Sequence, residues 1–589
     1  MRVSDGTTIA KCTIGRVTAN FELARVFYEM ATLLEVQDES RFRVRAYQRA
    51  AQTIEALGED VRTIAARGEL LKLPGVGRDL AARIDEYLRT GRIAQIESLR
   101  DGMPPSVLGL LEIRGLGPRT AKLLFDRLGV DSVDRLETVC RSKEILSVGG
   151  MGDKTIENIL KGIALWRAGR ARLPLPHARA IAAQLATALH AHGGVERLEV
   201  AGSIRRMCET VKDVDLLVTS TDPSRVIGTL CALPSVIEVL GRGDTRAAVR
   251  HQDGVQVDLR VVAPDAFGAA LQYFTGSKAH NVRVREIAAR RGLRVSEYGV
   301  FDEATGARIA GATEEDVYAA VGLAWIPPEI RENAGEIEAA REGRLPALVT
   351  AEAIRGDLHA HTEWSDGHHS LERLVDAAEA RGYEYIIVSD HSRSTAIANG
   401  LTVDRLRAQR AEIRALQPHH RIRILAGCEC DILADGAMDF PDEVLAELDV
   451  VLAAVHSRFK QTRAEMTARI VRALEHPHVD VLAHPTGRRI GTREPYDVDL
   501  ESVFAAARAH GKAVEINSSP ERLDLTETHA RRAAELGIPV AISTDTHYLS
   551  ELDHLELGLA VARRAWLTPA HVLNTRPLAD LLAWKSARR

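Results

Sequence analysis

The stretch that decides the fold of the middle of this chain reads Gly202-Ser203-Ile204-Arg205-Arg206, then Lys212-Asp213-Val214-Asp215-Leu216-Leu217-Val218, then Val255-Gln256-Val257-Asp258-Leu259-Arg260-Val261. The second and third runs alternate in polarity with a period of two, which is typical of a strand with one buried face. Asp213 and Asp215 therefore project from one face of the first strand. Asp258 joins them if the two strands are neighbours in one sheet.

Three carboxylates on one surface repel one another unless a cation lies between them, and oxygen-only ligands suit Mg²⁺ or Mn²⁺. Such a cluster binds two ions about 4 Å apart, which clamp the attacking and leaving oxygens of an in-line phosphoryl transfer. The turn at Gly202 and Ser203 offers backbone N–H groups to a phosphate, and Arg206 offers a guanidinium. An isolated Asp-x-Asp pair is often only a solvated strand face, but this combination predicts a nucleotidyl-transfer site.

Taken together, these residues resemble the nucleotidyltransferase palm of the family X DNA polymerases. The resemblance implies two Mg²⁺ or Mn²⁺ ions held by the catalytic residues Asp213, Asp215 and Asp258, and a triphosphate bound at Gly202, Ser203 and Arg206. The sequence departs from several relatives at Gln256, where they carry a basic residue. This departure bears on how the primer end is held.

The segment after the third acid reads Tyr273-Phe274-Thr275-Gly276-Ser277-Lys278 and places two aromatic residues beside a flexible Thr-Gly pair. Asn281 and Arg285 follow, four residues apart and on one face of an expected helix. An aromatic pair is core packing in most proteins, but this segment is similar to the thumb of the same family. The resemblance implies nucleotide contacts at Tyr273, Phe274 and Gly276 for the sugar and Asn281 for the base edge, and a template-strand contact at Arg285.

Three turns nearer the N-terminus repeat one hydrophobic-Gly-hydrophobic-Gly pattern: Leu73-Pro74-Gly75-Val76-Gly77, Ile113-Arg114-Gly115-Leu116-Gly117 and Val148-Gly149-Gly150-Met151-Gly152. A glycine turn that opens a helix aims N–H groups and the positive helix end at a phosphate, so it binds DNA without reading its sequence. One such turn could be an ordinary C-cap glycine, but three resemble helix-hairpin-helix motifs. The glycines expected to contact DNA are Gly75, Gly77, Gly115, Gly117, Gly150 and Gly152.

The segment Arg41–Arg49 adds four arginines. In a helix, Arg45 and Arg49 share a face with Tyr47 nearby and could hold the 5′-phosphate of a gap; a solvated helix face accounts for the same pattern. The region also resembles the family's small lyase domain, but the lysine that forms a Schiff base in animal relatives corresponds to Arg83 here. A guanidinium stays protonated and is a poor nucleophile, so lyase chemistry by that route is not expected.

Beyond a charged run at Glu329–Arg344, short apolar runs end repeatedly in His, Asp or Glu, with helical stretches such as 371–380 and 500–510 between them. The runs are Tyr385–His391, Val450–His456, Val481–His484 and Val540–His547. Alternating strands and helices with polar residues at the strand ends are typical of an α/β barrel whose site lies at the C-terminal face.

Nine potential metal ligands converge at these strand ends: His359, His361, Asp366, His391, Glu429, His456, His484, Asp545 and His547. At roughly three protein ligands per ion, nine predict about three ions, and mixed His and carboxylate ligands permit Zn²⁺, Mn²⁺ or Fe²⁺. Any one histidine alone would more often be a core or surface residue. The set resembles the polymerase and histidinol phosphatase (PHP) domain fused to bacterial family X polymerases, which implies metal-dependent phosphoester hydrolysis.

Cys428 and Cys430 flank Glu429, but strand alternation turns both away from it, so they are expected in the core. Four histidines without motif context are expected at the surface: His368, His369, His419 and His420.

The composition is that of a multidomain intracellular protein. At roughly one domain per 150 residues, 589 residues predict about four domains. Six scattered cysteines give no disulfide framework, and the N-terminus has no apolar signal region, so a cytoplasmic location is expected. No apolar run approaches the ~18 residues of a membrane span. Basic residues exceed acidic ones within 1–170, and acids exceed bases within 351–589.

We therefore expect a multidomain protein with α-helical helix-hairpin-helix N-terminal domains, an α+β nucleotidyltransferase palm and thumb, and a C-terminal α/β distorted TIM-like barrel. The expected boundaries are a first helical domain at 1–95, a second, fingers-like one at 96–170, the palm at 171–262, the thumb at 263–328, a linker at 329–352 and the PHP barrel at 353–589. The barrel follows the general α/β pattern.

The resemblance implies a monomeric DNA polymerase that binds gapped or primed double-stranded DNA and dNTPs, fills short repair gaps, and trims 3′ ends with a separate nuclease. Whether the barrel also cuts abasic sites or removes 3′-phosphates stays open. Two rival hypotheses are a PHP phosphatase for small metabolites with a relic polymerase half, and a non-catalytic DNA-binding scaffold. The three acids and three hairpins count against the phosphatase, which has no use for them.

Overall fold

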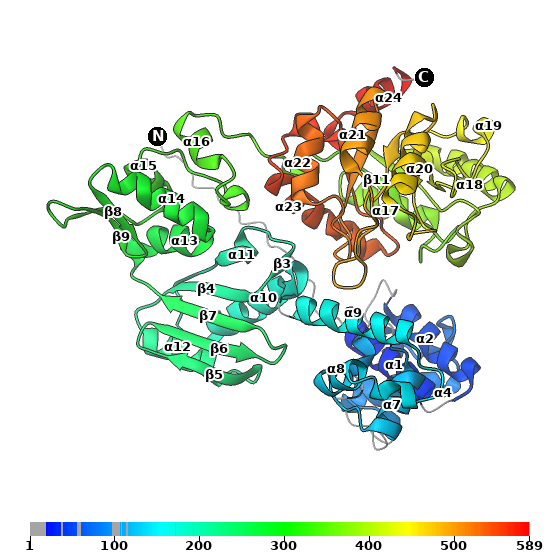
Figure 1. Ribbon diagram of the computed structural model, residues 1–589, viewed down its shortest axis with the longest axis horizontal. Coiled ribbons are helices and arrows are strands. Elements are labelled where there is room, and N and C mark those ends of the chain that lie inside the picture. The colour runs from blue at the N-terminus through cyan, green and yellow to red at the C-terminus, as the bar shows by residue number, and fades with distance from the viewer. Residues whose placement is uncertain are drawn as a thin grey trace. The chain divides into compact units, whose positions relative to one another are not determined.

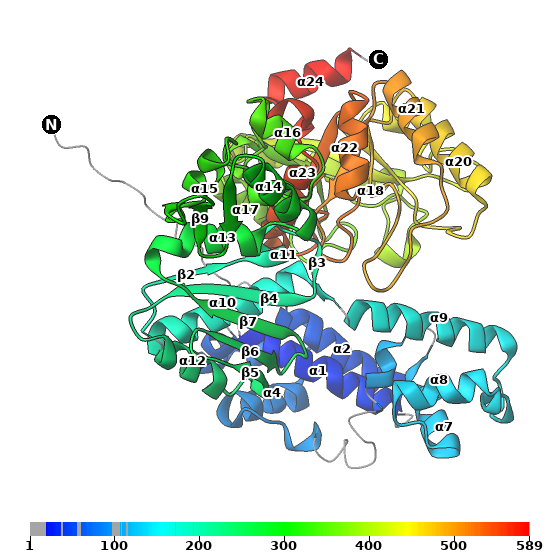
Figure 2. The same ribbon diagram turned by 60° about the vertical axis from the view of Figure 1, so that its left-hand side comes forward.

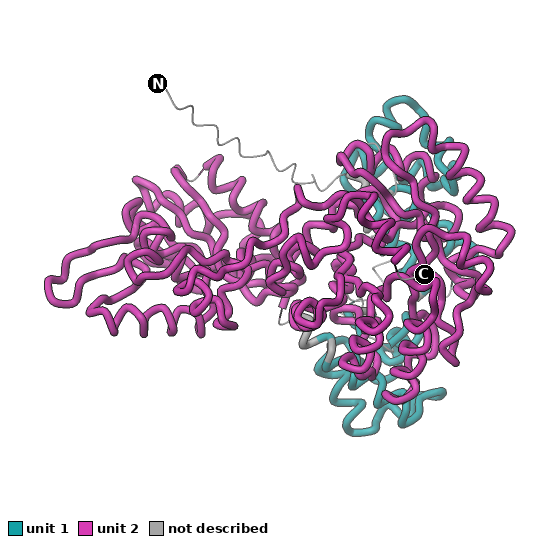
Figure 3. Tube along the Cα trace, turned by 90° about the horizontal axis from the view of Figure 1, so that it is seen from above, with its two compact units in different colours: residues 1–170 teal, residues 171–589 magenta. Residues whose placement is uncertain are grey.

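The computed structural model describes residues 19–36, 39–55, 61–96, 107, 109–113, 116–170, 172–192 and 194–587. The chain divides into two compact units, residues 1–170 and residues 171–589, which Figure 3 colours separately. None of the helices within these described ranges is both long and apolar enough to cross a membrane.

The first unit is helical. Within the described residues its helices are α1 (Ala19–Val36), α2 (Arg41–Glu55), α3 (Val61–Ala66), α4 (Arg78–Thr90), α7 (Pro118–Leu128), α8 (Val133–Arg141) and α9 (Asp153–Arg170). Their apolar faces form one core, in which the rings of Phe27 and Tyr47 lie 5.6 Å apart. A short 3₁₀ turn and a glycine turn precede each of α4, α7 and α9, so the unit repeats one local architecture.

The region predicted as the palm begins the second unit with a five-stranded sheet in the order β2-β4-β7-β6-β5 (Figure 1). Its strands are β2 (Arg197–Val200), β4 (Asp213–Thr219), β5 (Val236–Arg242), β6 (Arg246–His251) and β7 (Gln256–Val261); a small sheet pairs β1 (Leu173–Pro174) with β3 (Thr210–Val211). Strands β4 and β7 are parallel neighbours, as the two alternating runs require if their acids are to meet.

The two faces of the palm sheet have different neighbours. Val214, Leu216 and Val218 of β4 belong to the core formed with helices α10 (Leu175–His192) and α12 (Pro223–Ala232), which contact each other along the sheet (Figure 2). Leu217 points the other way and packs against α13 (Phe267–Thr275). Because side chains two apart share a face, the acidic residues of β4 lie on the α13 side.

The thumb follows with α13, α14 (Lys278–Ala289), the three-stranded sheet β8 (Leu293–Ser296), β9 (Gly299–Asp302) and β10 (Arg308–Ala310), and α15 (Glu314–Ala320). The segment predicted as a linker is largely folded onto it. Helix α16 (Glu336–Arg341) contributes Ile337 and Ala340 to the thumb core, and Arg331 and Glu336 are buried. Some charged residues of this run therefore form buried ion pairs, Arg331 with Glu314 and Glu336 with His280, and others face solvent.

The barrel consists of seven parallel strands in sequence order, β11 (Gly356–Ala360), β12 (Tyr385–Val388), β13 (Arg423–Asp431), β14 (Val450–Ala454), β15 (Val481–Leu482), β16 (Ala513–Asn517) and β17 (Val540–Ser543). Backbone hydrogen bonds from Asp545 N–H to the His359 carbonyl (3.0 Å) and from His361 N–H to the Thr546 carbonyl (2.9 Å) join its ends. The prediction of a TIM-like barrel is confirmed, with seven strands rather than eight.

Helices surround the barrel strands (Figure 1). They are α17 (Leu371–Ala380), α18 (Val403–Leu416), α19 (Asp442–Leu445), α20 (Arg463–Glu475), α21 (Leu500–Ala509), α22 (Glu527–Glu535), α23 (Leu555–Arg564) and α24 (Leu578–Ser586). Along β12, Ile387 packs in a cluster with Leu452 and with Leu581 of α24, whereas Ile386 packs against α17. The two helices predicted at 371–380 and 500–510 agree with α17 and α21 to within one residue.

Helix α23 connects the barrel to the preceding α+β part of the second unit. The Arg564 guanidinium donates to the Arg206 carbonyl of the palm at 3.0 Å, to Glu332 beside the thumb at 3.1 Å and to Glu527 of the barrel at 2.9 Å. Arg488 of the barrel donates to Glu209 of the palm at 2.6 Å. These charge-assisted hydrogen bonds are partly buried, so they are stronger than exposed pairs.

Candidate functional site

The three palm acids lie on adjacent strands. Asp215 of β4 is in register with Asp258 of β7, and Asp213 is in register with Gln256. Asp213 and Asp215 are half-buried while the residue between them is buried, as the alternation predicted. The strand geometry therefore brings the three carboxylates to one patch of the sheet.

Electrostatics at this patch favours a cation. Burial raises the pKa of Asp215 to about 7, with a further contribution from the charges of Asp213 and Asp258. Burial also raises the pKa of Asp258, although Gln256 donates a hydrogen bond to it at 2.8 Å. Carboxylates whose pKa is raised by one another are suited to a divalent ion, which replaces the missing counter-charge.

Position 202 requires a glycine for two reasons, its backbone conformation and its closeness to Asp215. Its φ of +61° lies in the left-handed region, and a Cβ there would collide with the carboxylate of Asp215. It opens α11 (Gly202–Arg205), a single helical turn that also contains Ser203. The turn thus lies directly against the acidic patch, the position that a triphosphate site beside the acids needs.

Arg206 is held by protein partners. It donates to Glu332 at 2.9 Å and to the Thr275 carbonyl at 2.7 Å. Its neighbour Arg205 forms a two-point ion pair with Glu314, both contacts at 2.8 Å. Burial alone would raise the pKa of Glu314, but hydrogen bonds from Arg205 and Arg331 lower it to about 2.

The aromatic pair stands at the end of α13. The rings of Tyr273 and Phe274 meet edge to face, 5.2 Å apart. The Asn281 amide donates to the Tyr273 carbonyl at 2.6 Å and to the Gly276 carbonyl at 3.2 Å, and it accepts from Gln272 at 3.0 Å. Asn281 therefore fixes the turn between α13 and α14.

Arg285 lies one helical turn further along α14 and donates to the Asn281 carbonyl at 3.4 Å. Its contact with a template strand stays a prediction. The nucleotide contacts of Tyr273, Phe274, Gly276 and Asn281 stay predictions as well. In this structure the Asn281 side chain bonds to protein groups.

The glycine turns of the first unit share one geometry. The backbone N–H of Val76, Leu116 and Met151 donates to the carbonyl three residues earlier in each turn. Gly77 and Gly117 are the N-caps of α4 and α7, and a Cβ on either would meet open space. Gly75, Gly150 and Gly152 are exposed as well. Gly115 lies outside the described residues.

Helix α2 supports the first of these turns. A Cβ on Gly75 would lie 2.8 Å from Cδ of Arg49, and Thr53 donates to the Pro74 carbonyl at 2.8 Å. Arg45 and Arg49 are exposed, but Tyr47 is buried in the core and does not share their surface. The expectation of Tyr47 beside the two arginines is therefore wrong, because its position belongs to the apolar face of α2.

Arg83 of α4 lies in a half-buried position. Its guanidinium is 3.4 Å from the carboxylate of Asp79 one turn earlier. Burial raises the pKa of Tyr47, and the nearby charge of Arg83 opposes that rise. The side chain is thus held as a cation among protein groups.

All nine candidate ligands of the barrel converge at the C-terminal ends of its strands. Glu429 is the hub: its Oε1 lies 2.7 Å from Nε2 of His484 and 3.1 Å from Nε2 of His456, and its Oε2 lies 2.9 Å from Nδ1 of His391. His359 Nε2 is 3.4 Å from the same Oε2. Six of the seven strands contribute a ligand.

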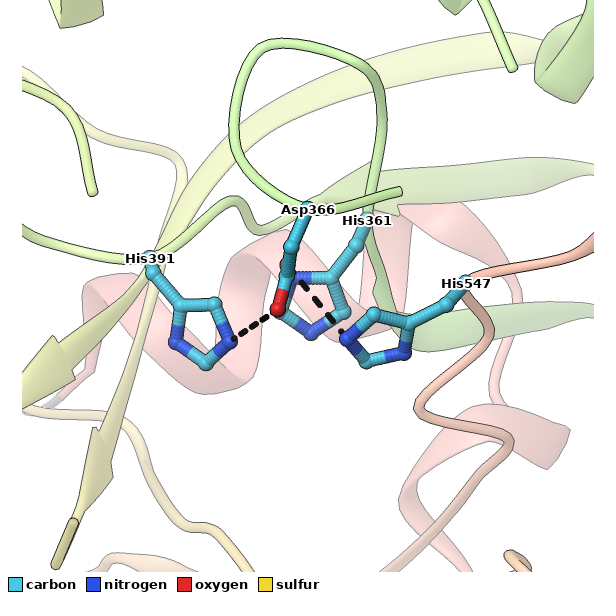
Figure 4. Close-up of side chains that lie close together, drawn as sticks. All are labelled: His361, Asp366, His391 and His547. Atoms are coloured by element: carbon cyan, nitrogen blue, oxygen red, sulfur yellow. Dashed lines mark ion pairs between the residues drawn. The ribbon is translucent and has the colours of Figure 1, made fainter. Parts of the chain in front are cut away.

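A second carboxylate, that of Asp366, lies among three rings, of which His391 also contacts Glu429. Figure 4 shows His361, His391 and His547 turned toward Asp366, and the distances from their nitrogens to its oxygens are 3.8, 3.6 and 3.4 Å. Asp545 lies 3.1 Å from Nε2 of His361.

Three overlapping groups of side chains have ligand atoms within 4.8 Å of one another. They are His361, Asp366, His391 and His547; then His359, His361, Glu429 and Asp545; then His391, Glu429 and His456. His359 Nε2, His361 Nδ1 and Glu429 Oε2 are buried without a hydrogen-bond partner. Buried polar atoms without a partner are costly, so this donor set fits bound cations. Seven of the nine candidate ligands, all but His359 and His361, line a cavity of about 420 Å³.

Burial and neighbouring charges shift the pKa values of the cluster's side chains in different directions. Burial alone would raise the pKa of Glu429, but the charges of His456 and His391 hold it well below the usual range. Burial alone would lower the pKa of His456, but Glu429 and Asp431 raise it to about 10. Burial lowers the pKa of His484 to about 4. The histidine and carboxylate charges of the cluster therefore stabilise one another.

Comparisons with known families agree with this layout. Models of a helix-hairpin-helix domain, a SAM-like helix-hairpin-helix tandem, the DNA polymerase beta thumb and the PHP domain match residues 18–93, 107–164, 270–332 and 357–519. The protein named DNA polymerase/3′-5′ exonuclease PolX of Bacillus subtilis (strain 168) is 37% identical over 568 residues, which are 96% of this chain and 98% of that protein. The chain belongs to the family X DNA polymerases with a PHP domain.

Two further relatives each cover part of this family X polymerase. A probable phosphatase of Thermoanaerobacter sp. (strain X514) is 31% identical over 232 residues, 37% of this chain and 89% of that protein. DNA polymerase lambda of Rattus norvegicus is 25% identical over 342 residues, 53% of this chain and 56% of that protein.

Sequence reasoning missed the residues that orient the ligands of this family X polymerase. Glu515 of β16 lies 2.8 Å from Nδ1 of His359 and accepts from the His484 N–H at 2.7 Å. Asn517, two residues on and on the same face, donates to Asp545 at 3.0 Å. Asp431 lies 2.5 Å from Nδ1 of His456. Such partners fix the ring orientation of metal-binding histidines.

The signal for two of these residues was in the sequence. Glu515 and Asn517 interrupt an apolar run at positions two apart, the same pattern that singled out Asp213 and Asp215. Strand alternation also correctly placed Cys428 and Cys430 in the core. The expectation that His369 is at the surface is wrong: it is buried in the loop that carries Asp366. His368 stacks on Tyr548, with ring centroids 4.0 Å apart, and His419 is exposed.

Proposed function

We propose that this chain is a DNA-directed DNA polymerase that fills short gaps during DNA repair, with a metal-dependent 3′-5′ exonuclease in its PHP barrel. One observation carries the proposal: a carboxylate patch and a His-rich ligand cluster occur in one chain that is 37% identical over 96% of its length to a protein named DNA polymerase/3′-5′ exonuclease. The relation to DNA polymerase lambda supports gap filling.

In the palm, we assign Asp213, Asp215 and Asp258 to two Mg²⁺ or Mn²⁺ ions, which when bound supply charge for phosphoryl transfer. The Gly202-Ser203 turn would receive the triphosphate beside them, because no side chain at Gly202 blocks the approach. Arg206 would exchange its partner Glu332 for a phosphate oxygen. The ends of α13 and α14 would then contact the sugar and base through Tyr273, Phe274, Gly276 and Asn281.

In the barrel, we assign the nine ligands to about three Zn²⁺, Mn²⁺ or Fe²⁺ ions, which when bound activate water toward phosphorus. Glu515 and Asp431 would hold His359 and His456 in orientation. His359 and Glu429 are among the buried members of the cluster, whereas Asp366 and His547 are partly exposed. A strand end would enter through the cavity that the ligands line.

The finer proposals follow the sequence expectations. The domain boundaries are those given above, with gapped or primed double-stranded DNA and dNTPs as partners and a monomer as the working state. Gly75, Gly77, Gly115, Gly117, Gly150 and Gly152 are assigned to DNA backbone contacts, together with Arg45, Arg49 and Arg285. The exposed glycine turns before α4, α7 and α9 support this assignment.

A second candidate activity of the barrel is removal of 3′-phosphates from DNA ends. The 31% identity to a probable phosphatase over 232 residues favours it. Removal of a 3′-phosphate needs the same attack of water on phosphorus and the same departure of a strand's 3′ oxygen, and it releases inorganic phosphate in place of a nucleoside 5′-monophosphate.

A gapped duplex with a labelled primer tests the proposal. With Mg²⁺ or Mn²⁺ and dNTPs the primer should extend across the gap, and without dNTPs it should shorten from its 3′ end. A chain that hydrolyses only small phosphoesters would instead support the metabolite phosphatase, and one that binds DNA without reaction would support the scaffold.

Alanine at Gly77 and Gly117 together should weaken DNA binding about tenfold without unfolding the first unit. Both glycines have ordinary φ values, −83° and −79°, and a Cβ on either meets open space. The added methyl groups therefore collide only with an approaching phosphate. Fluorescence anisotropy with a gapped duplex measures the effect, and wild-type affinity should fall steeply with salt but vary little with sequence.

The control for this pair is Gly109→Ala, since Gly109 also faces open space, with φ −60°, but lies outside the turns. Unchanged affinity in the double variant, or an affinity that ignores salt, would contradict phosphate binding by these turns.

Borohydride should trap little covalent adduct between the unaltered chain and an incised abasic site. Arg83 replaces the amine that the reaction needs and is held 3.4 Å from Asp79. Arg83→Lys restores an amine at the same position and should increase the trapped fraction on a denaturing gel. Efficient trapping by the unaltered chain would show that another lysine serves.

A further inference from the structure

Ile397 is the most exposed large apolar side chain in the described part of the chain, with an exposed fraction of 100%. It lies in the loop between β12 and α18, at the mouth of the cavity that the candidate metal ligands line. An isolated exposed isoleucine is ordinary on a protein surface. An exposed isoleucine at the mouth of a cavity lined by polar candidate ligands suggests a role in contacting a ligand.

The loop around Ile397 is fixed on both sides. Ser394 N–H donates to Asp439 at 2.8 Å and the Thr395 hydroxyl donates to Asp431 at 2.8 Å. The Asn399 amide donates to the carbonyls of residues 364 and 365, both at 3.2 Å. Asp431 also holds His456, so the loop that presents Ile397 is tied to a candidate metal ligand.

Arginines occupy another part of the same cavity wall. Arg489 and Arg493, in the loop after β15, exchange backbone hydrogen bonds of 2.8 Å. Arg522, in the loop after β16, is nearly buried, with its Nε 3.6 Å from Asp545. We call Arg489, Arg493 and Arg522 the basic rim.

Ile397 and the basic rim lie on opposite sides of the mouth. In a closed ring of seven strands, β12 is separated from β15 and β16 by three or four positions in either direction, which is the largest separation the ring permits. The cavity thus has Ile397 on one side and the basic rim on the other, with the ligand cluster between them. Within the rim side, Arg489 lies 3.7 Å from Glu521 and Arg493 stacks over Phe459.

A nucleic-acid end matches this division, because each nucleotide has an apolar base face and an anionic backbone. We propose that Ile397 is a positioning residue that holds the 3′-terminal base of a DNA strand while the basic rim holds the backbone phosphates upstream of it. The scissile phosphodiester then lies at the ligand cluster. This inference rests on the proposed exonuclease function and adds the residues that select strand ends over small phosphoesters.

The reaction that this placement serves is hydrolysis. Water adds to phosphorus, the bond from phosphorus to the 3′ oxygen of the preceding nucleotide breaks, and that oxygen takes a proton. A nucleoside 5′-monophosphate leaves, and the shortened strand keeps a 3′-hydroxyl. No oxidant or co-reactant other than water is needed.

The test compares Ile397→Ala with the unaltered full-length chain on two substrates in Mn²⁺: a 5′-labelled single-stranded oligonucleotide and bis(p-nitrophenyl) phosphate. The KM for the oligonucleotide should rise about tenfold, since burial of an isoleucine against a base is lost. The kcat and KM for the small diester should change less than twofold. Ile397→Phe should restore the oligonucleotide KM, because an aromatic ring also packs on a base.

Two further variants separate the parts of the proposal. Ile237→Ala removes another exposed isoleucine, 62% exposed, from the palm edge strand, far in sequence from the cavity, and should leave both substrates unaffected. Arg489→Gln should lower the slope of log affinity against log salt for the oligonucleotide by roughly 0.7, the value for one phosphate contact on a single strand.

The outcomes are distinct. If the unaltered chain shortens the oligonucleotide but Ile397→Ala leaves its KM within twofold, or slows both substrates equally, the positioning role is refuted and the exonuclease stands. If the unaltered chain cleaves bis(p-nitrophenyl) phosphate but never the oligonucleotide, the proposed function fails and the inference fails with it.

Discussion

Replacing Asp215 with alanine should reduce nucleotide addition at a DNA gap by at least about a thousandfold, while degradation from 3′ ends continues. Asp215 is central to the acidic patch: it is in register with Asp258 and lies two residues from Asp213 on the same face. It is also the residue against which Gly202 makes room. Its loss removes a carboxylate from the ions that the patch would hold, and the barrel ligands are untouched.

Primer extension on a gapped duplex measures the loss, and release of nucleotides from the same primer without dNTPs measures the retained activity. Asp253→Ala is the matched control, since Asp253 is a palm aspartate whose carboxylate pairs with His177 at 3.2 Å outside the patch. Substantial polymerisation by Asp215→Ala would refute the assignment of the three acids.

Replacing His359 and His361 together should lower 3′-5′ degradation by orders of magnitude and leave gap filling intact. Both rings are buried in the cluster, and His359 lies between Glu429 and Glu515. Two nitrogen ligands would be lost from overlapping groups, and the remaining acids cannot supply nitrogen. Metal analysis should find about three transition-metal ions per unaltered chain and fewer in the variant.

The double variant removes two buried rings and so also disturbs the packing of the barrel. Asp366→Asn is the milder test, because it changes one partly exposed side chain. Asp366 is about one-third exposed and faces three histidines, so the substitution keeps shape while removing charge. It should also suppress degradation, and exposed His419→Ala should not. Full nuclease activity in both cluster variants would defeat the barrel assignment, and loss of polymerisation alone would mean that the two sites had been assigned the wrong way round.

Period-two alternation predicted more of the palm than any other signal. It placed Asp213 and Asp215 on one face and their aliphatic neighbours in the core, because a strand leaves each residue only two directions. The adjacency of β4 and β7 needed one further assumption, that both strands share a sheet. In the barrel, the rule that polar residues follow apolar runs collected five of the nine candidate ligands, since parallel strands all end at one face. They are His391, His456, His484, Asp545 and His547.

Side-chain partners distant in sequence could not be predicted in this way. Arg206 and Glu332 are 126 residues apart, and no local pattern links them. Tyr47 was misplaced because its helix is basic on one side and apolar on the other. The number of arginines in the segment does not show where the basic face ends and the apolar face begins. Glu515 and Asn517 were missed with their strand β16, whose contacts with His359 and Asp545 depend on how the barrel closes.

The link made by α23 changes how the two chemistries can be separated in the laboratory. A chain cut before β11 would lose Arg564, which donates to both the Arg206 carbonyl and the carboxylate that holds the Arg206 side chain. It would also lose Trp566, which packs against the thumb core. A truncated polymerase half would therefore carry altered surroundings of Arg206 and a bare apolar surface, and its behaviour would report damage as well as the absence of the barrel. Point substitution in the intact chain is the cleaner dissection.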